Sequence, residues 1–121
     1  MSYKKSKYFR KNKKIRIKYF YLNKNSLITI VFFHGFMSDM IGEKPKAILK
    51  YCRKKKINFL KFEYSGHGRS SGKFTNGNIS KWTSDAKQLI KAKTKGKLLF
   101  VGSSMGSWIA LNLFPNFKKR I

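Results

Sequence analysis

Several kinds of residue are scarce in this sequence, and each shortage excludes a class of protein. Cys52 is the one cysteine among 121 residues, so an intrachain disulfide is impossible and no zinc cluster or other metal site is expected. A single thiol fits a reducing compartment, and we expect a cytoplasmic protein. No stretch approaches the ~20 apolar residues of a transmembrane helix, so no membrane span is predicted.

Acidic residues are also scarce. The chain has 29 Lys and Arg against 4 Asp and Glu, a formal charge of +25. That balance favours a polyanionic partner, and a non-catalytic basic binding module, for nucleic acid or an acidic partner, is the alternative function. However, 24 of the 29 cations are Lys, as in proteins from A/T-rich coding sequence, whereas phosphate-recognition surfaces favour Arg forks. We therefore interpret the charge as solvated surface and do not expect nucleic acid as a partner.

The most informative stretch is residues 98–113, LLFVGSSMGSWIALNL. Its first four residues form an unbroken apolar run, which predicts a parallel strand covered on both faces. Helical spacing begins at Met105, and Pro115 is predicted to end that helix. The segment between them fits G-x-S-x-G, with Ser104 at its centre.

In that motif the serine lies on a strained turn between a strand and a helix. Gly102 and Gly106 are small where neighbouring backbones crowd the turn. Ser104 would lie at a helix N-terminus, where free N–H groups and the helix dipole favour negative charge. This position suits a nucleophile whose attack on a carbonyl creates an oxyanion.

The rest of the chain alternates strands and helices. We predict a loose basic arm over 1–14, followed by strands over 15–21 and 27–33 that pair as a hairpin. A helix is predicted over 45–56, with Ala47, Ile48, Tyr51 and Cys52 on one face. A strand over 57–64, a glycine-rich loop over 65–72 and a helix over 79–95 are predicted to follow. This order implies an α/β fold, with a mostly parallel sheet and helices on both faces, over residues 15–121.

A second candidate element follows the strand over 27–33. His34, Gly35 and Phe36 form a turn at its carboxyl end, where ligands bind in such sheets. This turn, with Gly35 as its glycine, can direct the N–H of Phe36 towards Ser104, and the N–H of Met105 comes from the turn at residue 104 itself. We predict that these two donors form an oxyanion hole.

At this point the chain resembles the α/β-hydrolase superfamily. The resemblance rests on FFHGFMSDMIGEKPKAILKYC, FLKFEYSGHGRSSGKF, ISKWTSDAKQLI and LLFVGSSMGSWIAL, in that order. Within the superfamily it is most similar to the mitochondrial acyl-protein thioesterases (depalmitoylases and acyl-glucuronide esterases) and their bacterial relatives. The resemblance implies a serine hydrolase of small-molecule or acyl-protein esters or thioesters, with Ser104 as nucleophile, Phe36 and Met105 as oxyanion donors and no cofactor. The chain departs from the family at Glu63, where Asp is usual, and at Ser107, where a second glycine is common.

One absence bears directly on catalysis. In this fold the triad follows the order serine, acid, histidine, and no acid or histidine follows Ser104. His34 and His67 precede it, and we expect both to have structural roles in loops. We therefore expect the N-terminal half of a hydrolase domain, truncated after the helix that begins at Met105 and almost inactive alone. It would be either a truncated gene product or one half of an enzyme completed by a C-terminal chain. Residues 117–121 would lead into a further strand beside the predicted strand that precedes Ser104.

Overall fold

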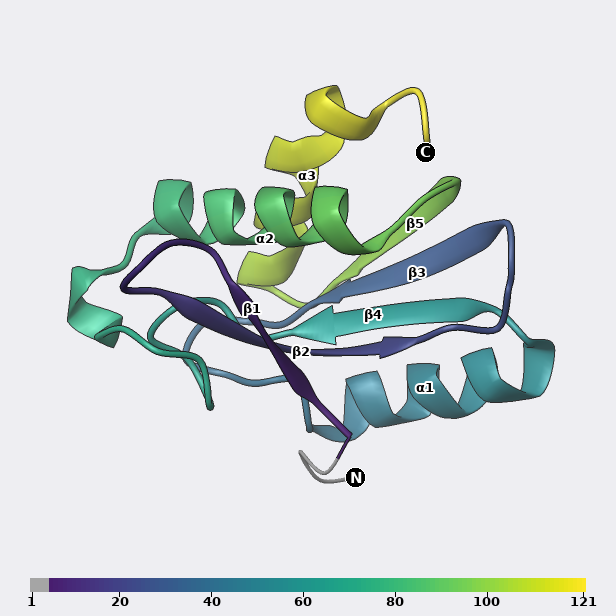
Figure 1. Cartoon of the computed structure of the whole chain (residues 1–121), viewed down its shortest axis with the longest axis horizontal. Coiled ribbons are helices and arrows are strands. Elements are labelled where there is room, and N and C mark those ends of the chain that lie inside the picture. The colour runs from purple at the N-terminus through teal and green to yellow at the C-terminus, as the bar shows by residue number, and fades with distance from the viewer. Residues whose placement is uncertain (1–4) are drawn as a thin grey trace.

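Five strands form one mixed sheet in the order β1-β2-β4-β3-β5 (Figure 1). The computed structural model describes residues 5–121. Its elements are β1 (Lys7–Arg10), β2 (Arg16–Leu22), β3 (Ile28–Phe33), α1 (Glu43–Lys55), β4 (Asn58–Phe62), a 3-10 turn (Phe74–Asn76), α2 (Ile79–Lys93), β5 (Lys97–Gly102) and α3 (Met105–Phe117). The ladders of β3 with β4 and with β5 are parallel, whereas β2 runs antiparallel to both β1 and β4.

The predicted hairpin between the strands over 15–21 and 27–33 is wrong. β4 lies between β2 and β3 and pairs with both. The side chain of Asn58, at the start of β4, explains the path of the connection. Its oxygen accepts from the backbone N–H of Lys24 at 2.7 Å and of Ser26 at 3.3 Å, and its amide donates to the carbonyl of Ser26 at 3.0 Å. The connection therefore arches over the end of β4 instead of turning tightly.

The predicted loose arm over 1–14 is also wrong for the part that the structure describes. β1 pairs with β2, with Phe9 opposite Ile17. Asn12 forms the turn between these strands, because its side-chain oxygen accepts from the N–H groups of Lys14 and Ile15 at 2.8 and 3.0 Å. Residues 1–4 lie outside the described residues.

Helices cover both faces of the sheet, as predicted (Figure 1). On one face α1 packs on a small cluster composed of Phe20, Ile30, Phe32, Leu49, Cys52 and Phe59. α2 and α3 pack together on the other face, over the larger cluster that includes Val31, Phe33, Leu60, Phe62, Leu89 and Ile109. The buried face of α1 differs from the prediction: Pro45, Leu49 and Cys52 are buried, whereas Ala47 and Tyr51 are exposed.

Two expectations about the C-terminal elements need correction. β5 lies at the edge of the sheet, where Leu99 is 51% exposed, so the strand is not covered on its α1 side. α3 continues through Pro115 to Phe117, because a proline in a last turn removes only one helical hydrogen bond. Within residues 5–121, every helix is too short or too polar to cross a bilayer.

Candidate active site

Ser104 occupies the turn between β5 and α3, and its backbone conformation is unusual. Its φ is 55° and its ψ is −119°, a combination that residues other than glycine rarely adopt. Hydrogen bonds hold the turn on both sides: the N–H of Ser103 donates to the carbonyl of Phe33 at 3.0 Å, and that of Ser107 donates to the carbonyl of Ser104 at 2.9 Å. The Ser104 side chain is exposed and makes no capping hydrogen bond, so its hydroxyl is open to a substrate.

The two glycines of the motif lie where neighbouring backbones leave no room. A Cβ at Gly102 would lie 2.5 Å from the Cα of Ser107, in the first turn of α3. A Cβ at Gly106 would lie 2.6 Å from the carbonyl carbon of Phe33 and 2.7 Å from the carbonyl oxygen of His34. The start of α3 is thus pressed against the end of β3, and this contact keeps the turn at residue 104 tight.

The turn over residues 34–36 lies directly beside the serine. A Cβ at Gly35 would lie 3.6 Å from the Cβ of Ser104 and 3.3 Å from the carbonyl oxygen of Ser103. The carbonyl of Gly35 accepts from the N–H of Ser38 at 3.2 Å, which bends the chain away after Phe36. The structure therefore brings together the two segments that the sequence predicts to supply the oxyanion donors.

His34 holds this turn in place. Its Nδ1–H donates to the carbonyl of Gly35 at 2.7 Å, and its Nε2 accepts from the backbone N–H of Tyr64 at 3.3 Å. The Tyr64 hydroxyl in turn donates to the carbonyl of His34 at 3.0 Å. Burial lowers the pKa of His34 to about 3, so the ring is neutral at pH 7 with both nitrogens occupied.

His67 is also built into the loops. Its ring is 3% exposed and packs edge-on against Phe74 and Trp82, with ring centroids 5.1 and 4.9 Å away. Nδ1 lies 3.2 Å from the carbonyl oxygen of Ser65, whereas Nε2 has no hydrogen-bond partner within the described residues. Burial lowers the pKa of this ring too. Both histidines thus have the loop contacts expected of them.

Two hollows of different polarity lie at this turn: Ser104 lines the first, and its neighbour Ser103 lines the second. On the side of α2 and α3 an open groove of about 670 Å³ is lined mainly by Phe36, Ile79, Trp82, Met105 and Trp108. On the side of α1 a smaller cleft is lined by polar residues that include Ser38, Asp39, Glu43, Lys44 and Ser103. In this cleft the Lys44 ammonium donates to the Ser103 hydroxyl at 3.3 Å.

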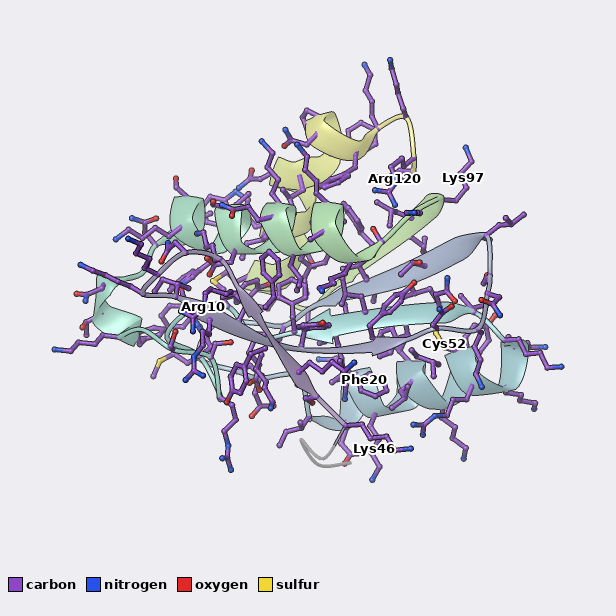
Figure 2. All side chains as sticks on the ribbon, viewed as in Figure 1. Arg10, Phe20, Lys46, Cys52, Lys97 and Arg120 are labelled. Carbon is purple, nitrogen blue, oxygen red and sulfur yellow. The ribbon has the colours of Figure 1, made fainter. Side chains whose placement is uncertain are left out.

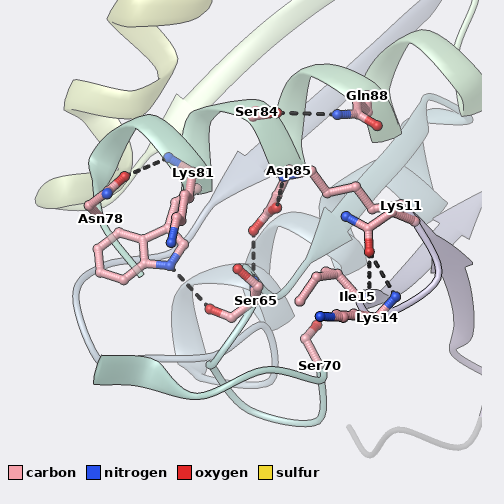
Figure 3. A network of polar contacts seen from close by, with 12 residues as sticks. Lys11, Lys14, Ile15, Ser65, Ser70, Asn78, Lys81, Ser84, Asp85 and Gln88 are labelled. Atoms are coloured by element: carbon pink, nitrogen blue, oxygen red, sulfur yellow. Dashed lines mark hydrogen bonds and ion pairs between the residues drawn. The ribbon is translucent and has the colours of Figure 1, made fainter. Parts of the chain in front are cut away.

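Sequence reasoning missed an ion pair that supports the glycine-rich loop. Asp85 of α2 is fully buried and accepts from Lys11 at 2.7 Å and from the backbone N–H of Ser65 at 2.8 Å (Figure 3). The indole of Trp82 donates to the carbonyl of Ser65 at 3.1 Å. An acid on the apolar face of the predicted helix over 79–95 was the available signal, but its partner comes from 74 residues earlier.

Glu63, which stands where the family usually has Asp, is buried and binds two loops. Its carboxylate accepts from the backbone N–H of Arg69 at 2.7 Å and of Met40 at 3.3 Å. It therefore ties the glycine-rich loop to the segment that follows the 34–36 turn. Among residues 5–121, no three His, Cys, Asp or Glu side chains are grouped closely enough to hold a metal ion.

Comparisons with known proteins agree with this geometry. Residues 25–121 match the model of the family Hydrolase_4, described as serine aminopeptidase, S33. Over 83 residues the chain is 35% identical to the palmitoyl-protein thioesterase ABHD10, mitochondrial, of Rattus norvegicus. That alignment covers 69% of this chain and 28% of the rat protein.

Solved structures give the same assignment. The mouse alpha/beta hydrolase domain-containing protein 10 superposes with a TM-score of 0.88 at 27% identity, over 95% of this chain and 46% of the mouse chain. A putative hydrolase from Agrobacterium vitis superposes with a TM-score of 0.85 at 30% identity, over 96% of this chain and 46% of its own. This chain thus spans less than half the length of these relatives, and it belongs to the Hydrolase_4 family of α/β-hydrolases, matching their N-terminal half.

Proposed function

We propose that Ser104 is the nucleophile of a hydrolase that cleaves carboxylic esters or thioesters. One observation supports this role above all others: Ser104 has a positive φ at the strand–helix turn, with its side chain exposed beside Gly35. Natural proteins keep such strain mainly where a function needs it. Ancestry in the α/β-hydrolases, with thioesterases among the relatives, supports the same chemistry.

The proposed reaction begins when the Ser104 hydroxyl oxygen attacks the acyl carbonyl carbon while its proton passes to a base. The backbone N–H groups of Phe36 and Met105 would stabilise the oxyanion, and removing one oxyanion donor from a serine protease of another fold costs about 3 kcal/mol. Expulsion of the alcohol or thiol leaves an acyl-serine. Water then attacks this ester, releasing the carboxylic acid and restoring the serine.

The two hollows suggest how a substrate is oriented. The groove lined by Phe36, Ile79, Trp82, Met105 and Trp108 would bury an apolar acyl group. The polar cleft that contains Lys44 and Ser103 would face the alcohol or thiol part. Esters and thioesters that combine an apolar acyl group with a polar leaving group, either small molecules or acylated proteins, are therefore the proposed substrates.

The base and its orienting acid are proposed to come from outside residues 1–121. Both nitrogens of His34 are occupied by backbone partners, and His67 is enclosed by aromatic rings. Removal of a triad member lowers kcat by about 10⁴-fold or more in well-studied serine hydrolases. We therefore expect little or no turnover from this chain by itself.

A fluorophosphonate probe, which labels activated serines, tests the proposal. The chain alone is compared with the chain fused to the half of the Agrobacterium vitis hydrolase that it does not match, and intact mass and peptide mapping locate the label. We expect labelling at Ser104 in the fusion only, abolished by Ser104→Ala and retained in the matched variant Ser103→Ala. Labelling elsewhere in a folded fusion would refute the assignment of the nucleophile, and strong labelling of Ser104 in the chain alone would refute the need for an external base.

A further inference from the structure

The charges of this chain are distributed unevenly between the two ends of the sheet. All four acids lie near the carboxyl ends of β3 and β4: Asp39 and Glu43 follow β3 along the chain, Glu63 follows β4, and Asp85 of α2 accepts from the loop after β4. The Ser104 turn lies at this same end, because it follows β5, which is parallel to β3. This end, called here the Ser104 end, therefore holds every negative side chain of the protein.

The opposite end of the sheet contains cations alone. It is formed by the loops over 23–27, 55–57 and 94–97, which lead into β3, β4 and β5, and by the turn over 118–121, where the carbonyl of Arg120 accepts from the N–H of Leu98 at the start of β5. Figure 2 shows Lys97 and Arg120 at this end of the molecule and Arg10 at the other. We call it the lysine end, because its exposed side chains include Lys24, Lys55, Lys56, Lys95, Lys97, Lys118 and Lys119, and no acid occurs in its loops.

The two ends are far enough apart for their charges to act separately. β3 has 6 residues, which at about 3.3 Å each separate the two ends by roughly 20 Å. The Debye length at physiological ionic strength is about 8 Å, so the acids of the Ser104 end are screened from the lysine end. The lysine end therefore presents a field of one sign to the solvent.

Apolar side chains protrude among these lysines. Leu27 is 84% exposed, the highest value among the large apolar residues that the structure describes, and Ile28 beside it is 43% exposed. The backbone of this loop is fixed, because the carbonyl of Leu27 accepts from the N–H of Lys97 at 2.9 Å and a Cβ at Gly96 would lie 2.7 Å from the same oxygen. The Leu27 side chain is thus held out into water by an ordered loop.

This combination of side chains favours an anionic bilayer over a nucleic acid. Recognition of nucleic acid relies on Arg forks and on exposed aromatic rings that stack on bases. The loops of the lysine end contain no aromatic residue, and the guanidinium of Arg120 donates to the Gly96 carbonyl at 2.7 Å and to the Thr94 hydroxyl at 3.0 Å. Clustered lysines beside exposed apolar side chains are typical of proteins that lie on anionic lipid.

We propose that the lysine end is a docking surface for an anionic lipid bilayer. Leu27 and Ile28 enter the headgroup layer, and the lysines around them face the lipid phosphates. This docking does not depend on the function proposed for Ser104. Because the Ser104 turn lies at the other end of the sheet, a docked molecule keeps its groove and polar cleft open to the aqueous side.

Vesicle sedimentation with the full chain measures the binding. The vesicles are phosphatidylcholine alone, or phosphatidylcholine and phosphatidylserine in equal molar parts. Each lysine near an anionic surface strengthens binding by about fivefold at moderate salt. We expect binding to the mixed vesicles only, with an affinity that falls as salt is added. Equal binding to both kinds of vesicle would overturn the proposal.

Variants distinguish the lysine end from the charge of the whole chain. Lys24→Glu combined with Lys97→Glu should weaken binding at least about twentyfold. Lys13→Glu combined with Lys46→Glu makes the same change of charge at exposed residues near the Ser104 end, and should weaken it by less than about threefold. Equal losses from the two pairs would show that the whole charge of the chain is responsible, and would overturn the proposal.

Leu27→Ser tests the apolar contact. It should weaken binding to the mixed vesicles about tenfold, because a buried leucine gains about that much from leaving water. Circular dichroism checks that each variant is folded. Single-stranded DNA is the competing ligand: DNA binding that is tighter than vesicle binding, and is weakened by the Lys24 and Lys97 changes but not by Leu27→Ser, would assign this end to nucleic acid instead.

Tryptophan fluorescence with brominated phosphatidylcholine in the mixed vesicles reports the orientation. Trp82 and Trp108 line the groove at Ser104, so their emission should not be quenched in the bound wild type. Leu27→Trp should add emission that the brominated lipid quenches. Quenching of the wild type, or an unquenched tryptophan at position 27 in bound protein, would show that another surface meets the bilayer and would overturn the proposal.

Discussion

Replacing Ser104 by glycine is predicted to stabilise the protein. The φ of 55° and ψ of −119° at this residue suit glycine, whereas a residue with a Cβ is strained there. The Ser104 side chain makes no capping hydrogen bond. Its removal therefore costs no hydrogen bond to a backbone N–H of α3. A substitution that usually weakens a helix start should therefore strengthen this one.

The magnitude follows from two opposing terms. Strain at a sparsely populated φ,ψ position is worth about 1–3 kcal/mol, and release of it favours the glycine variant. The greater freedom of glycine in the unfolded chain opposes this by about 0.4–1 kcal/mol. The net gain is about 1 kcal/mol. With an unfolding entropy of about 0.25 kcal/mol/K for a chain of 121 residues, it raises Tm by about 4 °C.

Urea denaturation of the wild type, Ser104→Gly and Ser104→Ala measures the effect. Ser104→Ala keeps the Cβ and should stay within about 0.5 kcal/mol of wild type. Asn78→Gly is the matched control at the start of α2, because Asn78 has a φ of −158° and its side chain caps Lys81 at 2.8 Å. It should lose stability by a few tenths of a kcal/mol. A lower free energy of unfolding for Ser104→Gly than for wild type would refute the strained turn.

Three further predictions concern the surroundings of the site. Gly106→Ala should destabilise the protein by at least about 2 kcal/mol in urea denaturation, although alanine favours helices, because its Cβ meets the carbonyl group of Phe33. Lys11→Met should cost about 3 kcal/mol, or about 12 °C in Tm, because it leaves the fully buried carboxylate of Asp85 without its cation. Protonation of His34 in the unfolded chain should lower the free energy of unfolding by about 2 kcal/mol between pH 7 and pH 5, and chemical denaturation at each pH measures this loss.

The sign of the His34 effect follows from its depressed pKa. The pKa is about 3 in the folded state against 6.5 in the unfolded state, so the unfolded chain binds a proton first as the pH falls. Stability is therefore full above pH 6.5 and is lost between pH 6.5 and 3. His34→Gln, which cannot titrate, should flatten this part of the profile; an unchanged slope would contradict the burial of a neutral ring.

Matched variants test the other two predictions. Lys13→Met removes an exposed lysine from the same turn as Lys11 and should change stability by less than about 0.5 kcal/mol. Asp85→Asn combined with Lys11→Met should recover part of the loss, since no charge is left buried. Gly42→Ala places a Cβ where no atom lies within 4 Å, so it should be tolerated. Equal losses of stability in Gly42→Ala and Gly106→Ala would contradict the close contact between the start of α3 and the end of β3.

The features that the sequence predicts well are those with a local physical signal. Ser104 falls on the strand–helix turn because the apolar run before it, the flanking glycines and the helical spacing after it all agree. The helix of Trp82, Ala86, Leu89 and Ile90 likewise follows from its periodic apolar face, which the structure buries.

The features that it predicts badly depend on partners far along the chain. The short distance along the sequence favoured a hairpin of β2 with β3. In the structure the side chain of Asn58 binds the connection between them across the end of β4, which lies between these two strands. The many basic residues over 1–14 did not indicate the strand β1. Tyr8 and Phe9 pack only after the turn at Asn12 brings β1 against β2, and this pairing has no local signal in the sequence. No local pattern could assign the partner of Asp85, since Lys11 lies 74 residues earlier.

A crystal structure of this chain would test the central claim most directly, through the backbone at Ser104 and the positions of the Phe36 and Met105 amides. We predict a positive φ near 55°, an exposed hydroxyl, and both N–H groups directed to one point beside that hydroxyl. A negative φ with the hydroxyl packed inward, or a 34–36 turn remote from residue 104, would contradict it.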